Sequence, residues 1–216
     1  MIIKDQPKCF PNNLKIALSS KSDGTVLNKS LGVHHPEIVK NRQVFCEKVG
    51  ISYENVAYQR IIYSENQTYN LICEVDEGST IKNTPEVVAD ALFTKSKNVA
   101  LFLPVADCIA TVIFDPKKEI LALLHLGRHS TLTNLLERVL NKFKSEGYDT
   151  KDLIVWMSPN AHAKSYIMEY FTEENNPLWR DFIATSEKGI HIDMQGFNAS
   201  ICQKAGIKPE NIHTST

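Results

Sequence analysis

Three short, almost purely apolar segments in the middle of the chain constrain the fold most strongly. They cover residues 99–103, 108–114 and 120–124, and an Asp-Pro-Lys-Lys stretch at 115–118 supplies turn residues between the last two. Uninterrupted apolar runs of strand length are typical of strands whose two faces are both covered. We therefore predict that these three runs are buried strands.

A strong helical pattern follows the third run. Six apolar side chains recur at helical spacing between residues 132 and 143, Gly147 ends the pattern, and Ser130 or Thr131 is available as the N-cap. The same reasoning predicts further strands and helices, with Gly50 and Gly206 as helix stops. The strands are expected at 15–20, 56–63, 69–75 and 154–157, and the helices at 36–49 and 197–205. No repeat or linker divides the chain, so we predict one α/β domain over residues 1–216.

Composition excludes several classes of protein. Lys plus Arg number 24 against 25 for Asp plus Glu, so there is no basic excess to hold a nucleic acid. No apolar run approaches the roughly 20 residues of a membrane-spanning helix, and the start of the chain does not resemble a secretion signal. Five scattered cysteines do not suggest a disulfide framework. We therefore expect a cytoplasmic protein that uses neither nucleic acid nor membrane.

Two groups able to do chemistry stand at the ends of the central strands. Cys108 opens one strand after Asp107, and His125 ends the next, just before Gly127 and the predicted helix. If these strands are neighbours, the thiol and the imidazole converge at one sheet edge, beside a helix N-terminus that attracts anions. A thiol, an imidazole and a helix N-terminus in one place are typical of a metal site or of a catalytic cysteine nucleophile. The simpler interpretation is a buried cysteine and a structural histidine, and two ligands fall short of the three that a catalytic zinc usually takes.

Short motifs around these residues resemble those of a known family. They are Asp-Ala-Leu-Phe-Thr at 90–94, Ala-Asp-Cys at 106–108 and His-Leu-Gly at 125–127, with weaker matches along most of the chain. Together they are similar to the YfiH-like proteins, also called laccase-domain or multicopper polyphenol oxidoreductase proteins, whose members act as zinc-dependent purine nucleoside phosphorylases. The resemblance implies an α/β sandwich with a central mixed sheet flanked by helices, related to the fold of the CNF toxins and CheD proteins.

The resemblance also implies a metal centre, and the sequence departs from it at one ligand. Cys108 and His125 match two of the three zinc ligands of the family. The third is a histidine in a Gln-Val-His-Gly motif; Gln59 matches that motif, but the histidine position holds Ile61. His129 or His162 offers a substitute imidazole, although exposed loop histidines are the simpler interpretation. The chain also stops at Thr216, where family members continue through a further segment.

By the same resemblance, the partners are a small nucleoside, such as adenosine or inosine, and phosphate. Cys108 and His125 would hold zinc, and Asp107 would orient a ligand or transfer a proton. The residues expected to bind phosphate or substrate are Arg128, His129, Ser130, Lys21 and Arg42. The protein is expected to be a monomer or a weak homo-oligomer.

Two other functions remain open from the sequence. A metal-free enzyme of the deamidase type would use Cys108 as nucleophile and His125 as base. A catalytically inactive paralogue would bind a nucleoside or a protein instead. A copper oxidase is the weakest interpretation, because seven dispersed histidines do not supply the clustered ligands that copper requires.

Overall fold

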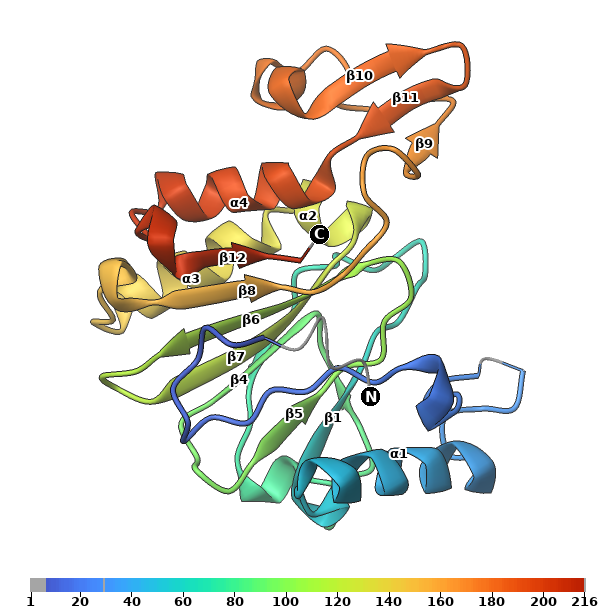
Figure 1. Cartoon of the computed structure of the whole chain (residues 1–216), viewed down its shortest axis with the longest axis vertical. Helices are drawn as coiled ribbons and strands as arrows, with labels where there is room; N and C mark the ends of the chain where they lie inside the picture. The colour runs from blue at the N-terminus through green and yellow to red at the C-terminus, as the bar shows by residue number, and fades with distance from the viewer. Residues whose placement is uncertain (1–6, 29, 216) are drawn as a thin grey trace.

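The central sheet that the family resemblance implies is present and has six strands (Figure 1). The computed structural model describes residues 7–28 and 30–215. The strand order is β12-β8-β6-β7-β4-β2; β6 pairs antiparallel with β7 and β8, β4 pairs antiparallel with β7, and the outer pairs are parallel. The strands are β2 (Ile72–Glu74), β4 (Ala91–Thr94), β6 (Ile109–Asp115), β7 (Ile120–Leu126), β8 (Ile154–Met157) and β12 (Ile212–Thr214). The α/β architecture with a central mixed sheet is therefore confirmed.

The hairpin of β6 and β7 forms because its turn residues satisfy one another. The buried Asp115 carboxylate accepts hydrogen bonds from the backbone N–H groups of Lys117 (2.7 Å) and Lys118 (3.0 Å). Glu119 closes the turn with a φ of 54°. The apolar residues on both sides then pair in register, from Asp115 opposite Ile120 to Ile109 opposite Leu126.

The predicted helix after β7 is two helices, α2 (Arg128–Leu132) and α3 (Leu135–Ser145). Asn134 separates them in the left-handed conformation, with a φ of 58°, which asparagine tolerates better than most residues. The expectation of a single helix capped by Ser130 or Thr131 is therefore wrong, because both residues lie inside α2.

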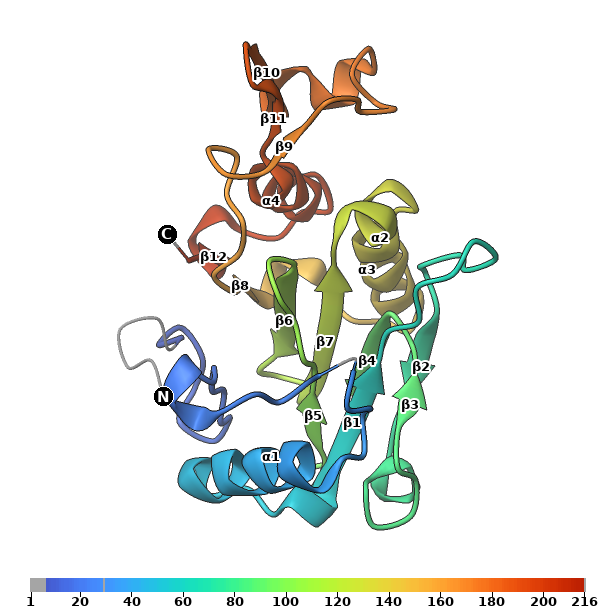
Figure 2. The same cartoon turned by 90° about the vertical axis from the view of Figure 1, so that its right-hand side faces the viewer.

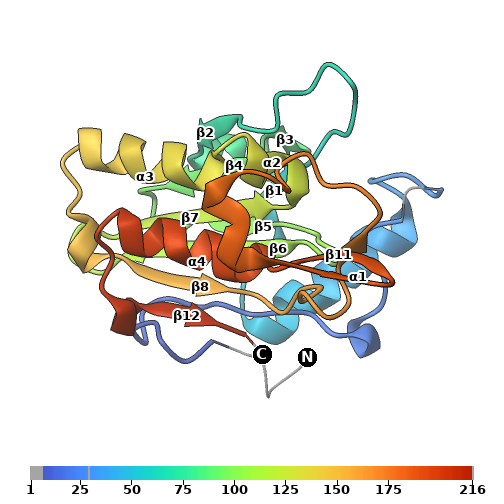
Figure 3. The same cartoon turned by 90° about the horizontal axis from the view of Figure 1, so that it is seen from above.

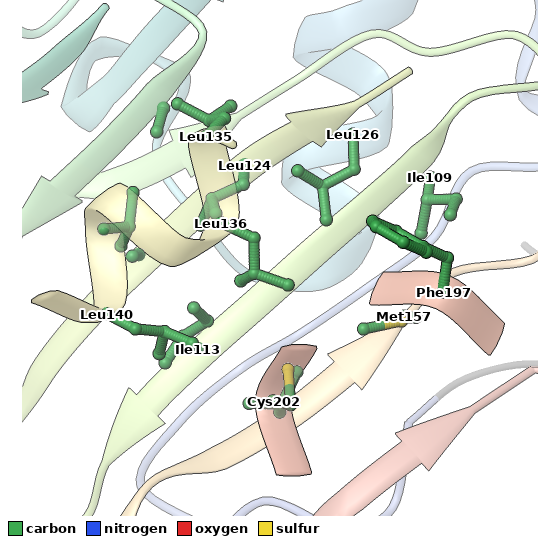
Figure 4. Packing of buried hydrophobic residues seen from close by; sticks show 14 of the residues in the cluster. Ile109, Ile113, Leu124, Leu126, Leu135, Leu136, Leu140, Met157, Phe197 and Cys202 are labelled. Atoms are coloured by element: carbon green, nitrogen blue, oxygen red, sulfur yellow. The ribbon is translucent and has the colours of Figure 1, made fainter. Parts of the chain in front are cut away.

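The main core lies between the central sheet and the helices α3 and α4 (Met194–Lys204) (Figures 3 and 4). Figure 3 shows these two helices side by side over the sheet. Alternate residues of β6 and β7 face them, together with the apolar stripe of α3 and the inner face of α4. The labelled residues of this cluster include Ile109, Ile113, Leu124, Leu126, Leu136, Leu140, Phe197 and Cys202. Burial of such side chains contributes about 1.5–3 kcal/mol each, so this layer stabilises the sheet.

The opposite side of the sheet carries α1 (Pro36–Val49) and a parallel three-stranded sheet (Figure 2). That sheet has the order β3-β1-β5, with β1 (Val56–Arg60), β3 (Val87–Val88) and β5 (Ala100–Phe102). The first apolar run thus forms β5 outside the central sheet, because β5 pairs with β1.

The segment 15–20 is not a strand, contrary to prediction. It lines a cavity together with residues 97–105, so the two segments face each other across a space instead of forming a ladder. A third, antiparallel sheet projects beyond α4, with β9 (Ile167–Met168), β10 (Ile183–Ser186) and β11 (Gly189–Ile192) (Figure 1). In the described part of the chain, no helix has the length and apolar character needed to cross a bilayer.

The packing of α3 predicts which substitutions destabilise the fold. Phe143 is fully buried against Phe93 and Tyr148, so Phe143→Ala should leave a cavity and lower the free energy of unfolding by roughly 3–5 kcal/mol. Urea unfolding followed by circular dichroism measures this change. The exposed Lys144→Ala on the same helix is the control and should change stability by less than about 0.5 kcal/mol. Equal effects of the two substitutions would contradict this account of the core.

Candidate functional site

The register of β6 and β7 places Cys108 and His125 on the same face of the central sheet. Ala110 pairs with His125 and Ile109 with Leu126, so the next position along β6 sets Cys108 opposite Gly127. Directly paired residues project to the same face, and this face is opposite the one that Ile109 and Leu126 turn toward α3 and α4. The two reactive groups therefore lie beside α1 and β5, away from the main core.

Gly127 makes the approach of the two groups possible. A Cβ atom built on Gly127 would lie 3.0 Å from the Cys108 Sγ and 3.3 Å from the His125 Cε1. Because Gly127 has no side chain, the Cys108 thiol and the His125 ring can both approach its Cα. The structure thus brings the two residues together, as the sequence analysis expected.

The turn after β7 is held by Ser130. Its hydroxyl donates to the His125 carbonyl (2.7 Å) and accepts the Gly127 N–H (2.9 Å), and its side chain is buried. The His125 N–H donates to the carbonyl of Asp90, the residue just before β4 (2.9 Å). Ser130 therefore fixes the backbone beneath the site, and its hydroxyl is engaged by the chain itself.

Aromatic side chains form one wall of the site. The Tyr63 hydroxyl lies 3.2 Å from the His125 Nε2, and the two rings meet edge to face. The ring of Tyr69 packs beside Tyr63, and it stacks on His129 with a centroid separation of 4.5 Å. Three flat rings thus stand next to the thiol–imidazole pair.

Arg128 provides the positive charge next to the pair. Its Nη2 lies 3.2 Å from the His129 Nε2. Burial raises the pKa of the nearby Tyr166 phenol, the charge of Arg128 lowers it, and a Cys108 thiolate would raise it further. The predicted anion site at the start of a long helix is not formed, because α2 has five residues and α3 begins only at Leu135.

A cavity of about 630 Å³ opens on the Cys108 side of the sheet. Asp107, Cys108, Ala110 and Pro159 line it, together with the outer face of β7, the end of α1 and residues 13–19. Its walls are mostly apolar, and its volume suits a small organic molecule. The thiol of Cys108 therefore faces a space that a substrate can enter.

Burial keeps both reactive groups uncharged near neutral pH. It raises the pKa of the Cys108 thiol, and the neighbouring Asp107 carboxylate raises it further. Burial also lowers the pKa of His125 to about 4, with a smaller contribution from His129. The same desolvation, with the charges of Cys108, Tyr69 and Asp90, raises the pKa of Tyr63 to about 12. The pair is a thiol and a neutral imidazole, not a thiolate and an imidazolium.

The remaining predicted residues lie in different surroundings. Asp107 is exposed, has a left-handed backbone with a φ of 69°, and accepts the Ala161 N–H through its carbonyl. Lys21 is exposed in a short 3₁₀ turn. Arg42 is fully buried in α1, where it donates to the Val26 carbonyl (2.8 Å) and to the Tyr58 hydroxyl (2.9 Å). Among the described residues, neither basic side chain hydrogen-bonds Cys108 or His125.

The donor set does not fit a three-ligand zinc site. No group of three His, Cys, Asp or Glu side chains that could hold a metal occurs in the described part of the chain, and Ile61 has no donor atom. The His125 Nε2 faces the Tyr63 hydroxyl. Within the same described residues the buried Nδ1 has no hydrogen-bond partner, whereas a metal-binding histidine usually donates its second N–H to an acceptor. Zinc therefore remains a prediction from the family resemblance alone.

Tyr63 is the residue that the sequence analysis missed. It follows the Ile61 position by two residues, in the loop between β1 and β2. The only sequence signal was its nearness to the missing ligand. The contact with His125 depends on how that loop folds back over β7, which no local pattern predicts.

The low pKa of His125 predicts a pH-dependent stability. Its folded-state pKa of about 4 lies below the ordinary value near 6.5, so the unfolded chain binds more protons between these values. The stabilisation is complete above about pH 6.5 and is lost as the pH falls toward 4, by about 2–3 kcal/mol. Urea unfolding at pH 7 and pH 4.5 should show a smaller loss in His125→Gln than in the native chain. Equal losses in both proteins would contradict the burial of a neutral His125.

Comparison with known proteins places the chain in a family. Residues 19–216 match the family described as multi-copper polyphenol oxidoreductase laccase. A purine nucleoside phosphorylase of Staphylococcus aureus (strain MRSA252) is 26% identical over 184 residues, which cover 82% of this chain and 68% of that protein. The purine nucleoside phosphorylase YlmD of Bacillus subtilis (strain 168) is 22% identical over 236 residues, which cover 100% of this chain and 83% of that protein.

Solved structures show the same fold. The hypothetical protein YfiH of Bacillus licheniformis superposes with a TM-score of 0.72 at 19% identity, over 86% of this chain and 73% of the other. YlmD of Geobacillus stearothermophilus superposes with a TM-score of 0.69 at 20% identity, over the same shares of 86% and 73%. The chain therefore belongs to the multi-copper polyphenol oxidoreductase laccase family and is a YfiH-like protein.

Proposed function

We propose that this chain binds purine nucleosides at the Cys108–His125 site, and that it catalyses their phosphorolysis much more slowly than a relative with a complete set of metal ligands. The convergence of the thiol and the imidazole over Gly127 carries this proposal. The names of the relatives supply the substrate class. The missing donor at Ile61 supplies the reason for slow turnover.

The walls of the site suit a nucleoside. A purine base is flat and aromatic, and it stacks on aromatic side chains such as Tyr63 and Tyr69. Cys108, but neither Tyr63 nor Tyr69, lines the cavity of about 630 Å³, which is ample for a base and a ribose. The neutral thiol and the two phenols supply hydrogen-bond donors and acceptors to polar atoms of the ligand.

Arg128 is the residue that we expect to hold phosphate. Its guanidinium is permanently charged and presents a planar set of donors that matches phosphate oxygens. Its contact with His129 holds this group at the start of α2, one residue after Gly127. A phosphate held there would be close to a ribose bound against the thiol.

Phosphorolysis places specific demands on these residues. A phosphate oxygen forms a bond to the ribose C1′, the bond from C1′ to the purine N9 breaks, and the electron pair leaves with the base, which then takes up a proton. Tyr63 and Cys108 carry protons near neutral pH, because burial raises both pKa values. Neutral phenols and thiols are weak acids, so they assist the departing base only slightly. This is a further reason to expect slow turnover.

Binding and turnover can be measured separately. Inosine and adenosine, with and without phosphate, should raise the melting temperature of the native chain in a thermal-shift assay, and titration calorimetry gives the dissociation constant. Gly127→Ala should weaken binding by at least about tenfold, because the added methyl pushes the thiol and the ring apart. Gly78→Ala, in an exposed 3₁₀ turn, is the matched control. Failure of both nucleosides to bind the native chain would refute the proposed ligand.

Turnover is measured by release of the free base. With inosine and phosphate, we expect the native chain to form hypoxanthine at least about a hundredfold more slowly than the Staphylococcus aureus relative under the same conditions. An equal rate would show that the chain does not need the missing ligand, and would contradict the proposed loss of activity. Arg128→Ala should raise the phosphate concentration required for whatever rate remains, and Lys164→Ala, on an exposed loop, serves as the charge control.

A second candidate is a metal-free enzyme with Cys108 as nucleophile and His125 as base. The contact of both groups with the Gly127 position favours it. The electrostatics oppose it, because a cysteine nucleophile is activated as a thiolate beside a charged histidine, and burial disfavours both charged forms here.

Alkylation distinguishes a neutral Cys108 thiol from an activated Cys108 thiolate. Cys108 should react with iodoacetamide at pH 7 at least about tenfold more slowly than free cysteine, since its raised pKa leaves little thiolate. Its rate should rise as the pH increases above 9, and His125→Ala should not slow it. Peptide mapping by mass spectrometry measures the alkylation of Cys108 separately from that of the other four cysteines. Rapid labelling at pH 7 that is abolished in His125→Ala would instead support the nucleophile.

A further inference from the structure

The hydroxyl of Tyr63 covers the ring nitrogen of His125 that faces the site. The two atoms are 3.2 Å apart, and the rings are almost perpendicular at 88°, so the phenol points edge-on at Nε2. The other ring nitrogen, Nδ1, is buried within the protein. Any group that binds the imidazole from the site must therefore displace Tyr63.

The loop that carries Tyr63 is fastened at several points. The Tyr69 hydroxyl donates to the Ser64 carbonyl (3.1 Å), and the Tyr69 carbonyl accepts the Thr133 hydroxyl (3.1 Å). At the end of the loop, the Leu71 N–H donates to the buried Asp90 carboxylate (2.9 Å). These contacts tie the loop to β4 and to the turn between α2 and α3, so the position of Tyr63 is part of the fold.

The same loop contains the position of the missing ligand. Ile61 directly follows β1 and precedes Tyr63 by two residues. Two residues of chain span at most about 7 Å, so the isoleucine and the phenol lie in the same part of the loop. Ile61 thus places an apolar side chain where the family resemblance implies a histidine ligand. The hydroxyl of the nearby Tyr63 contacts His125 instead.

We propose that Tyr63 takes the place of the metal at His125, so that the Tyr63–His125 hydrogen bond beside Cys108 forms a centre that does not retain zinc. The phenol satisfies the imidazole nitrogen that a metal would otherwise occupy. The inference rests on the proposed function only in placing the ligand site at this pair. Zinc retention is measured without nucleoside, so its outcome is distinguishable from a failure of nucleoside binding.

The test restores the ligand and removes the phenol. The native chain, Ile61→His and Ile61→His/Tyr63→Phe are purified from zinc-supplemented cultures, and zinc per chain is measured by mass spectrometry after gel filtration. We expect less than about a tenth of an equivalent in the native chain and about one equivalent in the double variant, since three protein ligands make a typical zinc site. Ile61→His alone should bind zinc at least about tenfold more weakly than the double variant, because Tyr63 competes for His125.

The matched control moves the new histidine by one residue. Ile62→His/Tyr63→Phe has the same composition as the double variant, and it should retain no more zinc than the native chain. Stoichiometric zinc in the native chain that is lost in Cys108→Ser would overturn the proposal. So would equal zinc affinity of Ile61→His with and without Tyr63→Phe, or zinc retention by the double variant no better than that of the control.

A second measurement does not depend on the new histidine. Tyr63→Phe removes only one hydroxyl, and the ¹⁵N resonances of the His125 ring report the hydrogen bond at Nε2 directly. We expect the Nε2 resonance to shift in Tyr63→Phe and to stay unchanged in Tyr170→Phe, where an exposed phenol is removed. An unchanged His125 spectrum in Tyr63→Phe would overturn the proposed contact.

Discussion

The pairing of β6 with β7 is the constraint on which the site depends. Because Ala110 lies opposite His125, Cys108 falls opposite Gly127, and the sulfur and the ring share the space that a glycine leaves. A shift of the register by one residue would place Cys108 and His125 on opposite faces of the sheet. The buried apolar face of the two strands prevents that shift, so the core that stabilises the fold also positions the reactive pair.

The same geometry explains why Cys108 and His125 are both uncharged near neutral pH. The sheet face that carries it is covered by α1, β5 and the loop before β2, and this cover removes water from both groups. A buried thiol and a buried imidazole are each less costly when uncharged. In this family member, the Tyr63 phenol contacts the neutral imidazole, where a metal site would require a third donor atom.

Much of the fold could be predicted from local pattern. The helix from Pro36, the hairpin of β6 and β7 and the strand Ile154–Met157 follow from apolar spacing, turn residues and a glycine stop, and all three were confirmed. Two predictions from local pattern were wrong: the single helix after β7 and the strand at 15–20. Asn134 interrupts a helical pattern with a left-handed backbone, and residues 15–19 line a cavity and are not a strand; the apolar spacing indicates neither feature.

For the site, the sequence by itself determined the chemical inventory: a cysteine and a histidine at strand ends, a glycine two residues after the histidine, and an isoleucine where the family resemblance implies a third ligand. Only the tertiary structure decided the surroundings of these groups. The β1–β2 loop brings Tyr63 onto a histidine 62 residues away, burial places Arg42 against Tyr58, and Ser130 is engaged by the backbone. The physical reason is that contacts between distant segments depend on packing of whole layers, which no stretch of sequence encodes alone.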